Sequence, residues 1–294
     1  MKVGIKVKFW GVRGSIPTPG VKYVKYGGNT PCVEVLLPNN QLFIFDAGTG
    51  IRELGNTLCK GRKKHKIHIF LSHFHWDHIQ GLPFFMPSYI KGNNIVVLGM
   101  DLEGARLDKI ISNQMESIYF PIKLHTLAAN FQFQILAEGS NDIEGTRVDA
   151  IYINHPGQAM GYVVNFEKVK ICYLSDNELV PLWAAKYSET AYRSNTREKI
   201  LKLISGADLL IHDAQYTDEE YKTKVGWGHS PFGEVMRLAK DGRVKKLALF
   251  HHDPDHFDEH IDVLVADCDC KENPSRFSHV MECFAAHEGM ELHF

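Results

Sequence analysis

Ser72-His-Phe-His-Trp-Asp-His78 is the stretch that decides the fold, and it directly follows a run of residues expected to form a strand. In extended backbone, residues two apart project to the same side, so His73 and His75 can bind one metal ion together. Asp77 and His78 follow a bend and can therefore face a second ion. Neutral imidazole and carboxylate together suit zinc, iron or manganese. Four such ligands within six residues predict a metal-binding loop rather than a solvated histidine-rich loop.

The composition is that of a globular chain: 44% of the 294 residues are hydrophobic and 23% are charged. No stretch of 18 apolar residues exists, so we expect no membrane span. Lysine plus arginine (33) nearly balances aspartate plus glutamate (35), which argues against binding of long nucleic acid, because such binding needs a basic footprint. The first ten residues alternate charged with apolar side chains and are expected to form a strand, not a signal peptide.

Histidine is the unusual residue type, with 16 copies, several of them beside aspartates. The six cysteines are scattered, and only Cys268 and Cys270 lie close together, which is a weak signal for zinc. Without a secretion signal we expect free thiols in a reducing cytosol, and hence a cytoplasmic protein.

Strand patterns come first in each half of the chain and helical patterns follow, which suggests two sheets packed together with helices outside. We expect one domain over residues 1–294. The expected strands are Lys2–Phe9, Cys32–Leu37, Gln41–Phe45, Lys66–Leu71, Asn94–Leu98, Phe131–Leu136, Arg147–Ile153, Gly161–Phe166, Val169–Leu174, Asp208–His212 and Lys245–Phe250. The expected helices are Ile51–Cys59, Ala105–Ile118, Thr196–Ile204, one that opens with Ser230 as N-cap and Pro231 as its first residue, and one around Phe257–Cys268.

The Ser72–His78 stretch resembles the H-x-H-x-D-H signature of the metallo-β-lactamase fold hydrolases, and the resemblance extends over nearly the whole chain. Asp46, in Phe-Asp-Ala-Gly-Thr-Gly, is similar to the aspartate of the family's first motif. His155, in Asn-His-Pro-Gly, is similar to the isolated third histidine. Asp176, in Tyr-Leu-Ser-Asp, is similar to the bridging aspartate, and His251, directly after a strand, to the last ligand.

This resemblance implies an α+β fold, a four-layer αββα sandwich in which two mixed β-sheets pack face to face with helices outside. It also implies two divalent metal ions per chain, zinc or manganese, with iron as the alternative. The implied ligands are His73, His75 and His155 for one ion, and Asp77, His78 and His251 for the other, with Asp176 bridging the two. Two such ions share and polarise one water, which gives hydroxide at neutral pH. Asp77 is counted among the catalytic residues as well.

Two assignments leave alternatives open. His251 competes with His252 and His256 as the last ligand, and we favour His251 because it comes first after the strand. His252 and His256 are then expected to be exposed loop histidines. Asp46 is either a turn residue or a residue that orients a metal ligand.

Two later segments indicate a branch of the family. Leu209-Leu-Ile-His-Asp-Ala-Gln-Tyr216 resembles the ribonuclease Z segment in which an acidic residue follows a histidine, and Gly228-His-Ser-Pro231 resembles that group's His-Ser-Thr motif. On this resemblance His229 is a general acid, and Asp213 orients it and stabilises its protonated form. An alkoxide leaving group needs such a proton donor. A helix that starts at Ser230 would also offer backbone N–H groups to a phosphate.

The spacing between two motifs argues against a large RNA substrate. Ribonuclease Z inserts a long arm for transfer RNA between the third histidine and the bridging aspartate, whereas here Asp176 follows His155 by only 21 positions. The chain is therefore similar to the small phosphodiesterases of this group. We predict hydrolysis of a small, cyclic phosphodiester, with no long nucleic acid and no membrane as partner. We consider a homodimer as the assembly.

Two other function classes remain open: a metal-dependent carbonyl hydrolase (a lactonase or thioesterase), and a cofactor-biosynthesis oxygenase or binding protein on the same scaffold. The pair His229 and Asp213 discriminates between the first of these and a phosphodiesterase, since a thiolate leaving group needs no such acid.

Several residues near these motifs have open roles. Arg13 either contacts phosphate or lies at the pocket rim without such a contact. Trp76 and Trp227 either stack a base or form the pocket wall. We assign a third set, Phe84, Phe85 and Phe120, to the core or the wall.

Overall fold

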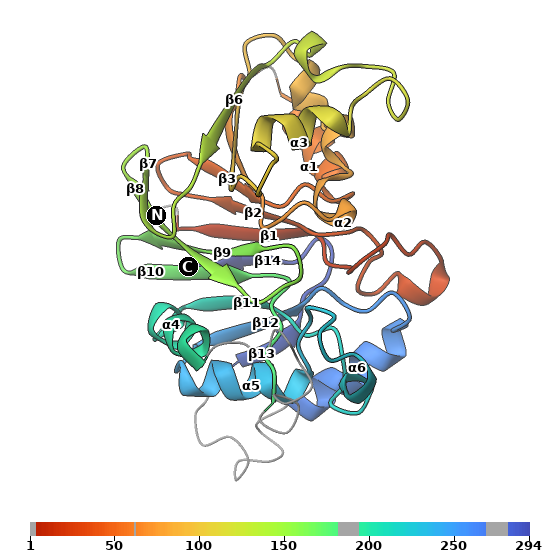
Figure 1. Cartoon of the computed structure of the whole chain (residues 1–294), viewed down its shortest axis with the longest axis vertical. Helices are drawn as coiled ribbons and strands as arrows, with labels where there is room; N and C mark the ends of the chain where they lie inside the picture. The colour runs from red at the N-terminus through yellow and green to blue at the C-terminus, as the bar shows by residue number, and fades with distance from the viewer. Residues whose placement is uncertain (1–3, 62, 182–193, 269–281) are drawn as a thin grey trace. The chain divides into compact units, whose positions relative to one another are not determined.

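The computed structural model describes residues 4–61, 63–181, 194–268 and 282–294. They form two compact units. Unit 1 takes its described residues from 1–19, 27–137 and 287–294, and unit 2 from 20–26 and 138–286. Each unit contains one seven-stranded mixed β-sheet accompanied by helices (Figure 1). The single domain expected over residues 1–294 stays a prediction.

The sheet of unit 1 has the strand order β14-β1-β2-β3-β4-β5-β6. The three pairs from β14 to β3 are antiparallel, and the three pairs from β3 to β6 are parallel. The strands are β1 (Lys6–Gly11), β2 (Cys32–Leu36), β3 (Leu42–Phe45), β4 (Lys66–Phe70), β5 (Asn94–Gly99), β6 (Asn130–Ile135) and β14 (Glu291–His293). The helices are α1 (Ile51–Leu58), α2 (Trp76–Ile79) and α3 (Leu107–Asn113), with single 3₁₀ turns at Leu82–Phe84, Met86–Tyr89 and Leu124–Thr126.

The sheet of unit 2 has the order β13-β12-β11-β10-β9-β8-β7 and repeats this arrangement. The pairs from β7 to β10 are antiparallel, and those from β10 to β13 are parallel. The strands are β7 (Gly139–Ile143), β8 (Thr146–Ile153), β9 (Ala159–Phe166), β10 (Val169–Leu174), β11 (Leu209–Asp213), β12 (Lys246–Phe250) and β13 (Glu282–Ala285). The helices are α4 (Ser194–Ile204), α5 (Phe232–Asp241) and α6 (Asp258–Cys268), with 3₁₀ turns at Val21–Tyr23 and Glu220–Thr223.

Each unit has its own apolar core between its sheet and its helices. In unit 1, Ile44, Ile69 and Val97 of the sheet share a buried cluster with Ile51 and Leu54 of α1. Ile51 and Leu54 are three positions apart and therefore lie on the same face of α1, which packs against the sheet.

In unit 2, α5 follows the same rule. Val235 and Met236 precede Ala239 by four and three positions, so the three share one face, and they lie buried in one cluster with Leu210 of β11 and Leu247 of β12. Among the described residues, no helix is both long enough and apolar enough to cross a membrane.

Strand direction brings the sequence motifs to one edge of each sheet. In unit 1, the parallel strands β3 and β4 are followed by Asp46 and by the Ser72–His78 loop. In unit 2, β10 and β12 are parallel to β11, and β8 has the same direction because it is antiparallel to β9. His155, Asp176 and His251 therefore all lie beyond the carboxyl-terminal ends of strands, where parallel sheets place their ligand sites.

Most expected elements are present within one or two residues of their predicted bounds. The first strand, expected at Lys2–Phe9, is observed as β1 over Lys6–Gly11, and Lys2 and Val3 lie outside the described residues. Two other kinds of difference remain. The helix expected at Ala105–Ile118 is the shorter α3, which ends at Asn113 and starts at Leu107, whose N–H donates to Asp101 Oδ1 at 2.8 Å. The edge strands β7, β13 and β14 were not expected; β7 has the sequence Gly-Ser-Asn-Asp-Ile, which is typical of a turn and becomes a strand only by pairing with β8.

Candidate metal centre

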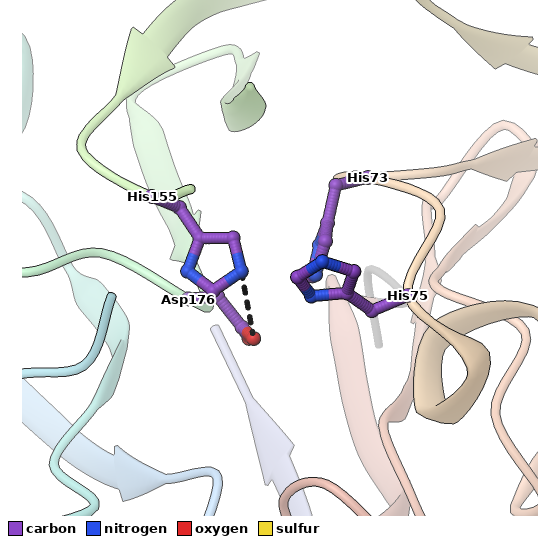
Figure 2. A group of neighbouring side chains, drawn as sticks. All are labelled: His73, His75, His155 and Asp176. Carbon is purple, nitrogen blue, oxygen red and sulfur yellow. Dashed lines mark ion pairs between the residues drawn. The ribbon is translucent and has the colours of Figure 1, made fainter. Parts of the chain in front are cut away.

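The Ser72–His78 loop of unit 1 ends in a single helical turn. His73 is buried, His75 is exposed and occupies the N-cap position of α2 with extended backbone, and the two rings are 4.5 Å apart (Figure 2). Asp77 and His78 lie in α2, where the sequence predicts a bend, and both are buried. The loop therefore brings the four predicted ligands together in two adjacent pairs.

Asp46 organises this loop from the end of β3. It is fully buried, has a φ of 60°, and its two carboxylate oxygens accept hydrogen bonds from Ser72 N (2.7 Å), Ser72 Oγ (2.8 Å) and His78 Nδ1 (2.8 Å). Ser72 Oγ in turn accepts the Nδ1 proton of His73 at 3.0 Å. Asp46 thus orients His78 directly and His73 through Ser72, which agrees with a ligand-orienting role and not with a simple turn residue.

Unit 2 assembles the other predicted ligands around Asp176. His251 Nε2 lies 3.3 Å from Asp176 Oδ1, and His155 Nε2 lies 3.9 Å from Asp176 Oδ2, the ion pair drawn in Figure 2. His155 donates its Nδ1 proton to the carbonyl of Gly228 at 3.0 Å, and His251 donates its own to Gln215 Oε1 at 2.9 Å. Both Nε2 atoms therefore face the carboxylate.

The three histidines at the end of β12 are all buried, which corrects the expectation that two of them are exposed. His252 Nε2 donates to the carbonyl of Ala286 at 2.9 Å, and His256 Nε2 bonds Glu220 Oε1 at 2.9 Å. Of the three, His251 is the one beside Asp176. Its φ of 59° turns the imidazole toward that carboxylate at a cost in backbone strain.

His229 and Asp213 form a buried pair in unit 2. His229 Nδ1 lies 3.2 Å from Asp213 Oδ2 and 3.9 Å from Asp176 Oδ2, and its ring stacks on that of His251 at 4.9 Å. Asp213 also accepts the backbone N–H of Ser230 (3.1 Å) and of Gln215 (2.9 Å). Nδ1 of His229 is thus directed at a carboxylate.

The predicted cap of α5 differs from the observed one. Pro231 is the N-cap residue, and Ser230 Oγ instead donates to the carbonyl of Asn177 and accepts the N–H of Leu179 at 3.0 Å. The N–H of Ser230 bonds Asp213, and that of Phe232 bonds the carbonyl of Tyr216 at 2.9 Å. Both groups are already used, so neither serves the phosphate-binding helix terminus that the sequence predicts.

The residues with open roles are now placed within their units. Arg13 is fully buried and donates to the carbonyl of Gly27, so it is not a rim arginine. Trp76 and Trp227 are 83% and 57% exposed, so neither is a buried wall residue. Phe85 is buried as expected, whereas the ring of Phe84 is half exposed and contacts Phe120 at 5.4 Å. Cys270 lies outside the described residues.

The donor chemistry fits divalent metal ions. In each unit an imidazole that donates through Nδ1 directs its Nε2 atom at a carboxylate oxygen: His78 at Asp77 (3.1 Å), and His251 at Asp176 (3.3 Å). A metal ion bound beside such a pair takes both the nitrogen and the oxygen as ligands, whereas without metal a shared proton satisfies the pair. Nitrogen and carboxylate oxygen are the ligands of zinc and manganese, and the partner at each Nδ1 is the usual orienting contact.

Three residues of this arrangement were not predicted. Gln215 lies within the segment quoted from the sequence, two positions after Asp213, but nothing in the pattern marks it as the partner of His251. Ser72 precedes the histidine motif as an ordinary loop residue. Ser15 donates its N–H to Asp77 Oδ2 at 2.9 Å from a loop 62 residues earlier.

Comparison with known proteins decides the family. Residues 42–252 match the family model described as the β-lactamase superfamily domain. The chain belongs to the β-lactamase superfamily. A superfamily relative, the ribonuclease Z of Staphylococcus carnosus (strain TM300), is 24% identical over 304 residues, which cover 90% of this chain and 93% of the relative.

Solved structures agree on the superfamily's fold. The metallo-β-lactamase fold protein YhfI from Bacillus subtilis superposes with a TM-score of 0.68 at 16% identity, covering 99% of this chain and all of the other. A diphosphatase from the PhnP family superposes with a TM-score of 0.66 at 18% identity, over 99% and 98% of the two chains. The predicted α+β class with two mixed sheets, and the resemblance to a metallo-β-lactamase fold hydrolase of the ribonuclease Z-like branch, are confirmed.

Proposed function

We propose that this superfamily member is a metal-dependent phosphodiesterase that hydrolyses a small, cyclic phosphodiester, with His229 as general acid. The observation that carries the proposal is the buried pair of His229 and Asp213, held next to the ligands Asp176 and His251 in unit 2. A hydrolase that expels a thiolate needs no such donor, which disfavours a thioesterase. The relative named ribonuclease Z and the PhnP-family diphosphatase support phosphoric esters as the substrate class.

The proposed metal ligands keep the order of the family motifs. One ion is assigned to His73, His75 and His155, the other to Asp77, His78 and His251, and Asp176 to both. When bound, two such ions would lower the pKa of a shared water and so supply a hydroxide nucleophile at neutral pH. Within the chain, Asp46, Gln215 and the carbonyl of Gly228 keep the imidazoles in the tautomer that directs Nε2 to the metal.

His229 acts on the leaving group. As an imidazolium it donates its Nδ1 proton to Asp213 in a hydrogen bond and transfers its Nε2 proton to the departing alkoxide oxygen, which leaves the imidazole neutral. The backbone N–H groups of Ser230 and Gln215 hold the two oxygens of Asp213, so its orientation does not depend on His229. Such a positioned acid accelerates departure of a poor leaving group by about 10²–10⁴-fold.

The chain between His155 and Asp176 supports a small substrate. Residues 159–174 of this stretch form the antiparallel strands β9 and β10 with the turn between them, so no part of it is long enough for a substrate-binding arm. The net charge of −2 also lacks the basic excess of proteins that bind long nucleic acid.

The test compares substrates on protein reconstituted with zinc or manganese. Bis(p-nitrophenyl) phosphate, 2′,3′- and 3′,5′-cyclic nucleotides and a transfer RNA precursor are offered to the wild type, to His229→Ala and to a control, His260→Ala, whose side chain is exposed. We expect turnover of a cyclic nucleotide but not of the precursor. His229→Ala should keep its metal and lose about 10²-fold on the cyclic diester, and much less on the p-nitrophenyl ester, whose leaving group needs little protonation.

Three outcomes would contradict the proposal. Equal losses of His229→Ala on both esters would mean that His229 binds substrate or shapes the loop. Loss of metal in this variant would make it a ligand. Cleavage of the precursor in preference to every small diester would overturn the substrate class.

A further inference from the structure

A second buried carboxylate, Glu178, lies two positions after Asp176 and is not among the ligands or the acid pair. It is 3% exposed. Its Oε1 accepts hydrogen bonds from Tyr221 Oη and Gly226 N, both at 2.6 Å, and its Oε2 accepts the N–H of Gly228 at 3.1 Å. Glu178 thus accepts hydrogen bonds from two backbone N–H groups, those of Gly226 and Gly228, in the segment Gly226-Trp-Gly-His229. All of these residues belong to unit 2.

The backbone of this segment determines the position of two functional histidines. The carbonyl of Gly228 accepts the Nδ1 proton of His155, and His229 is the next residue. Gly228 has a φ of 91°, and a Cβ atom there would lie 2.2 Å from His155 Nδ1, so only glycine fits. A shift of the Gly228 peptide would therefore change the orientation of His155 and the distance from His229 to Asp213 together.

We propose that Glu178 is a positioning residue that holds the Gly226–His229 backbone, and through it sets the tautomer and orientation of His155 and the placement of His229 against Asp213. The part that concerns His229 rests on the proposed function, whereas the part that concerns His155 rests only on its being a metal ligand.

The number of donors shows why a carboxylate is needed here. Three donors converge on two oxygens, and an amide has only one acceptor oxygen, so one N–H of the loop would face the amide's own NH₂ group. Burial, followed by the hydrogen bond to Glu178, raises the pKa of Tyr221 above its ordinary value, which keeps this hydroxyl a donor. Glu178 is itself anchored, since its N–H donates to the carbonyl of Asn154 at 2.7 Å and its carbonyl accepts Asn154 Nδ2 at 2.9 Å.

Glu178→Gln tests this role in the full-length, zinc-reconstituted protein, with Tyr221→Phe as the matched control. The control removes one donor to the same carboxylate and leaves both loop N–H bonds in place. For Glu178→Gln we expect backbone amide exchange over residues 225–229 to rise about tenfold or more, and zinc affinity, measured by competition with a chelator, to fall about 10–100-fold. Turnover of a cyclic diester should fall more than that of bis(p-nitrophenyl) phosphate. Tyr221→Phe should match the wild type within about threefold in all of these measurements, although its thermal midpoint falls.

Two results would overturn the role of Glu178. One is wild-type amide exchange and zinc affinity in folded Glu178→Gln. The other is equal loss in Glu178→Gln and Tyr221→Phe with no dependence on leaving group, which is the result of a purely structural role. If Glu178→Gln does not fold, Glu178→Asp retains the charge but withdraws it by one methylene, and the same exchange and affinity measurements apply. Amide exchange and zinc affinity do not depend on whether His229 acts as a general acid. The substrate comparison with His229→Ala tests the proposed function, so its failure can be distinguished from a failure of the role of Glu178.

Discussion

Asp46→Asn is expected to weaken metal binding by reversing the tautomers of two histidines at once. Asparagine tolerates the φ of 60° at this position, so the backbone can stay as it is. The amide oxygen can still accept the N–H of Ser72, but its NH₂ group then takes the place of Oδ2, which in the native chain accepts from His78 Nδ1 and from Ser72 Oγ. His78 can pair with this NH₂ group only if its proton moves from Nδ1 to Nε2.

The same substitution reaches His73 through Ser72. In the native chain Ser72 Oγ donates to Asp46 and accepts from His73 Nδ1. Once the NH₂ group of the introduced amide donates to that hydroxyl oxygen, the hydroxyl proton is directed at His73 Nδ1, and His73 also becomes protonated on Nε2. An Nε2 that carries a proton cannot bind a metal.

The magnitude follows from the loss of an orienting partner, which typically reduces metal affinity about 10–100-fold, or ~1.4–2.8 kcal/mol. The metal-free protein should lose about 1–3 kcal/mol of unfolding free energy, because a buried charged acceptor of three hydrogen bonds is replaced by a neutral one. Chelator competition measures the first quantity, urea unfolding the second, and imidazole ¹⁵N shifts in the metal-free protein report the tautomers.

Ser72→Ala is the matched control, since it interrupts the connection to His73 and leaves the contact between Asp46 and His78 intact. It should cost less affinity than Asp46→Asn, and the two changes should not be additive when combined. Zinc affinity of Asp46→Asn within about threefold of the wild type, or unchanged Nδ1 protonation of His78, would refute the reasoning.

Three further outcomes are expected. Elemental analysis after dialysis should find about two metal equivalents in the wild type and a loss of metal and activity in Asp176→Ala, whose carboxylate is assigned to both ions; retained metal with full turnover would show that the bridge assignment is wrong. Leu210→Ala, in the core of unit 2, should lower the free energy of unfolding, measured by urea denaturation, by about 2–5 kcal/mol. A loss below ~1 kcal/mol would mean that the core around Leu210 is not packed as described. Burial raises the pKa of Cys172 to about 12, so this thiol is protonated and shielded from solvent at pH 8 and should be alkylated only as the chain unfolds. Peptide mass spectrometry measures the alkylation rate of each cysteine. Alkylation of Cys172 in the native protein as fast as that of the partly exposed Cys59 would contradict this expectation.

The cytoplasmic location and the homodimer that the sequence predicts stay predictions, as does the small cyclic substrate. The family and the two-sheet architecture were predictable because their signals are local. The predicted ligands His73, His75, Asp77 and His78 lie within six consecutive residues. Apolar runs such as Leu209–Ile211 mark buried strands at their positions in the chain.

Only the tertiary structure decided which residues orient these ligands. Gln215 meets His251 across 36 residues, Gly228 meets His155 across 73, and Glu178 meets Gly226 across 48. Each pair depends on strand order and register, which bring the ends of parallel strands to one edge, and no periodicity along the chain records that arrangement.

The same limit explains the local expectations that proved wrong. Serine is a preferred N-cap residue, but the Ser230 hydroxyl donates to the carbonyl of Asn177 instead of capping α5. Arg13 and His256 are residue types usually found at the surface, yet both are buried against partners distant in sequence, Gly27 and Glu220. Composition and spacing predict what a residue prefers to do in isolation, whereas the hydrogen bonds of a buried polar group are chosen by whichever partner the fold places within reach.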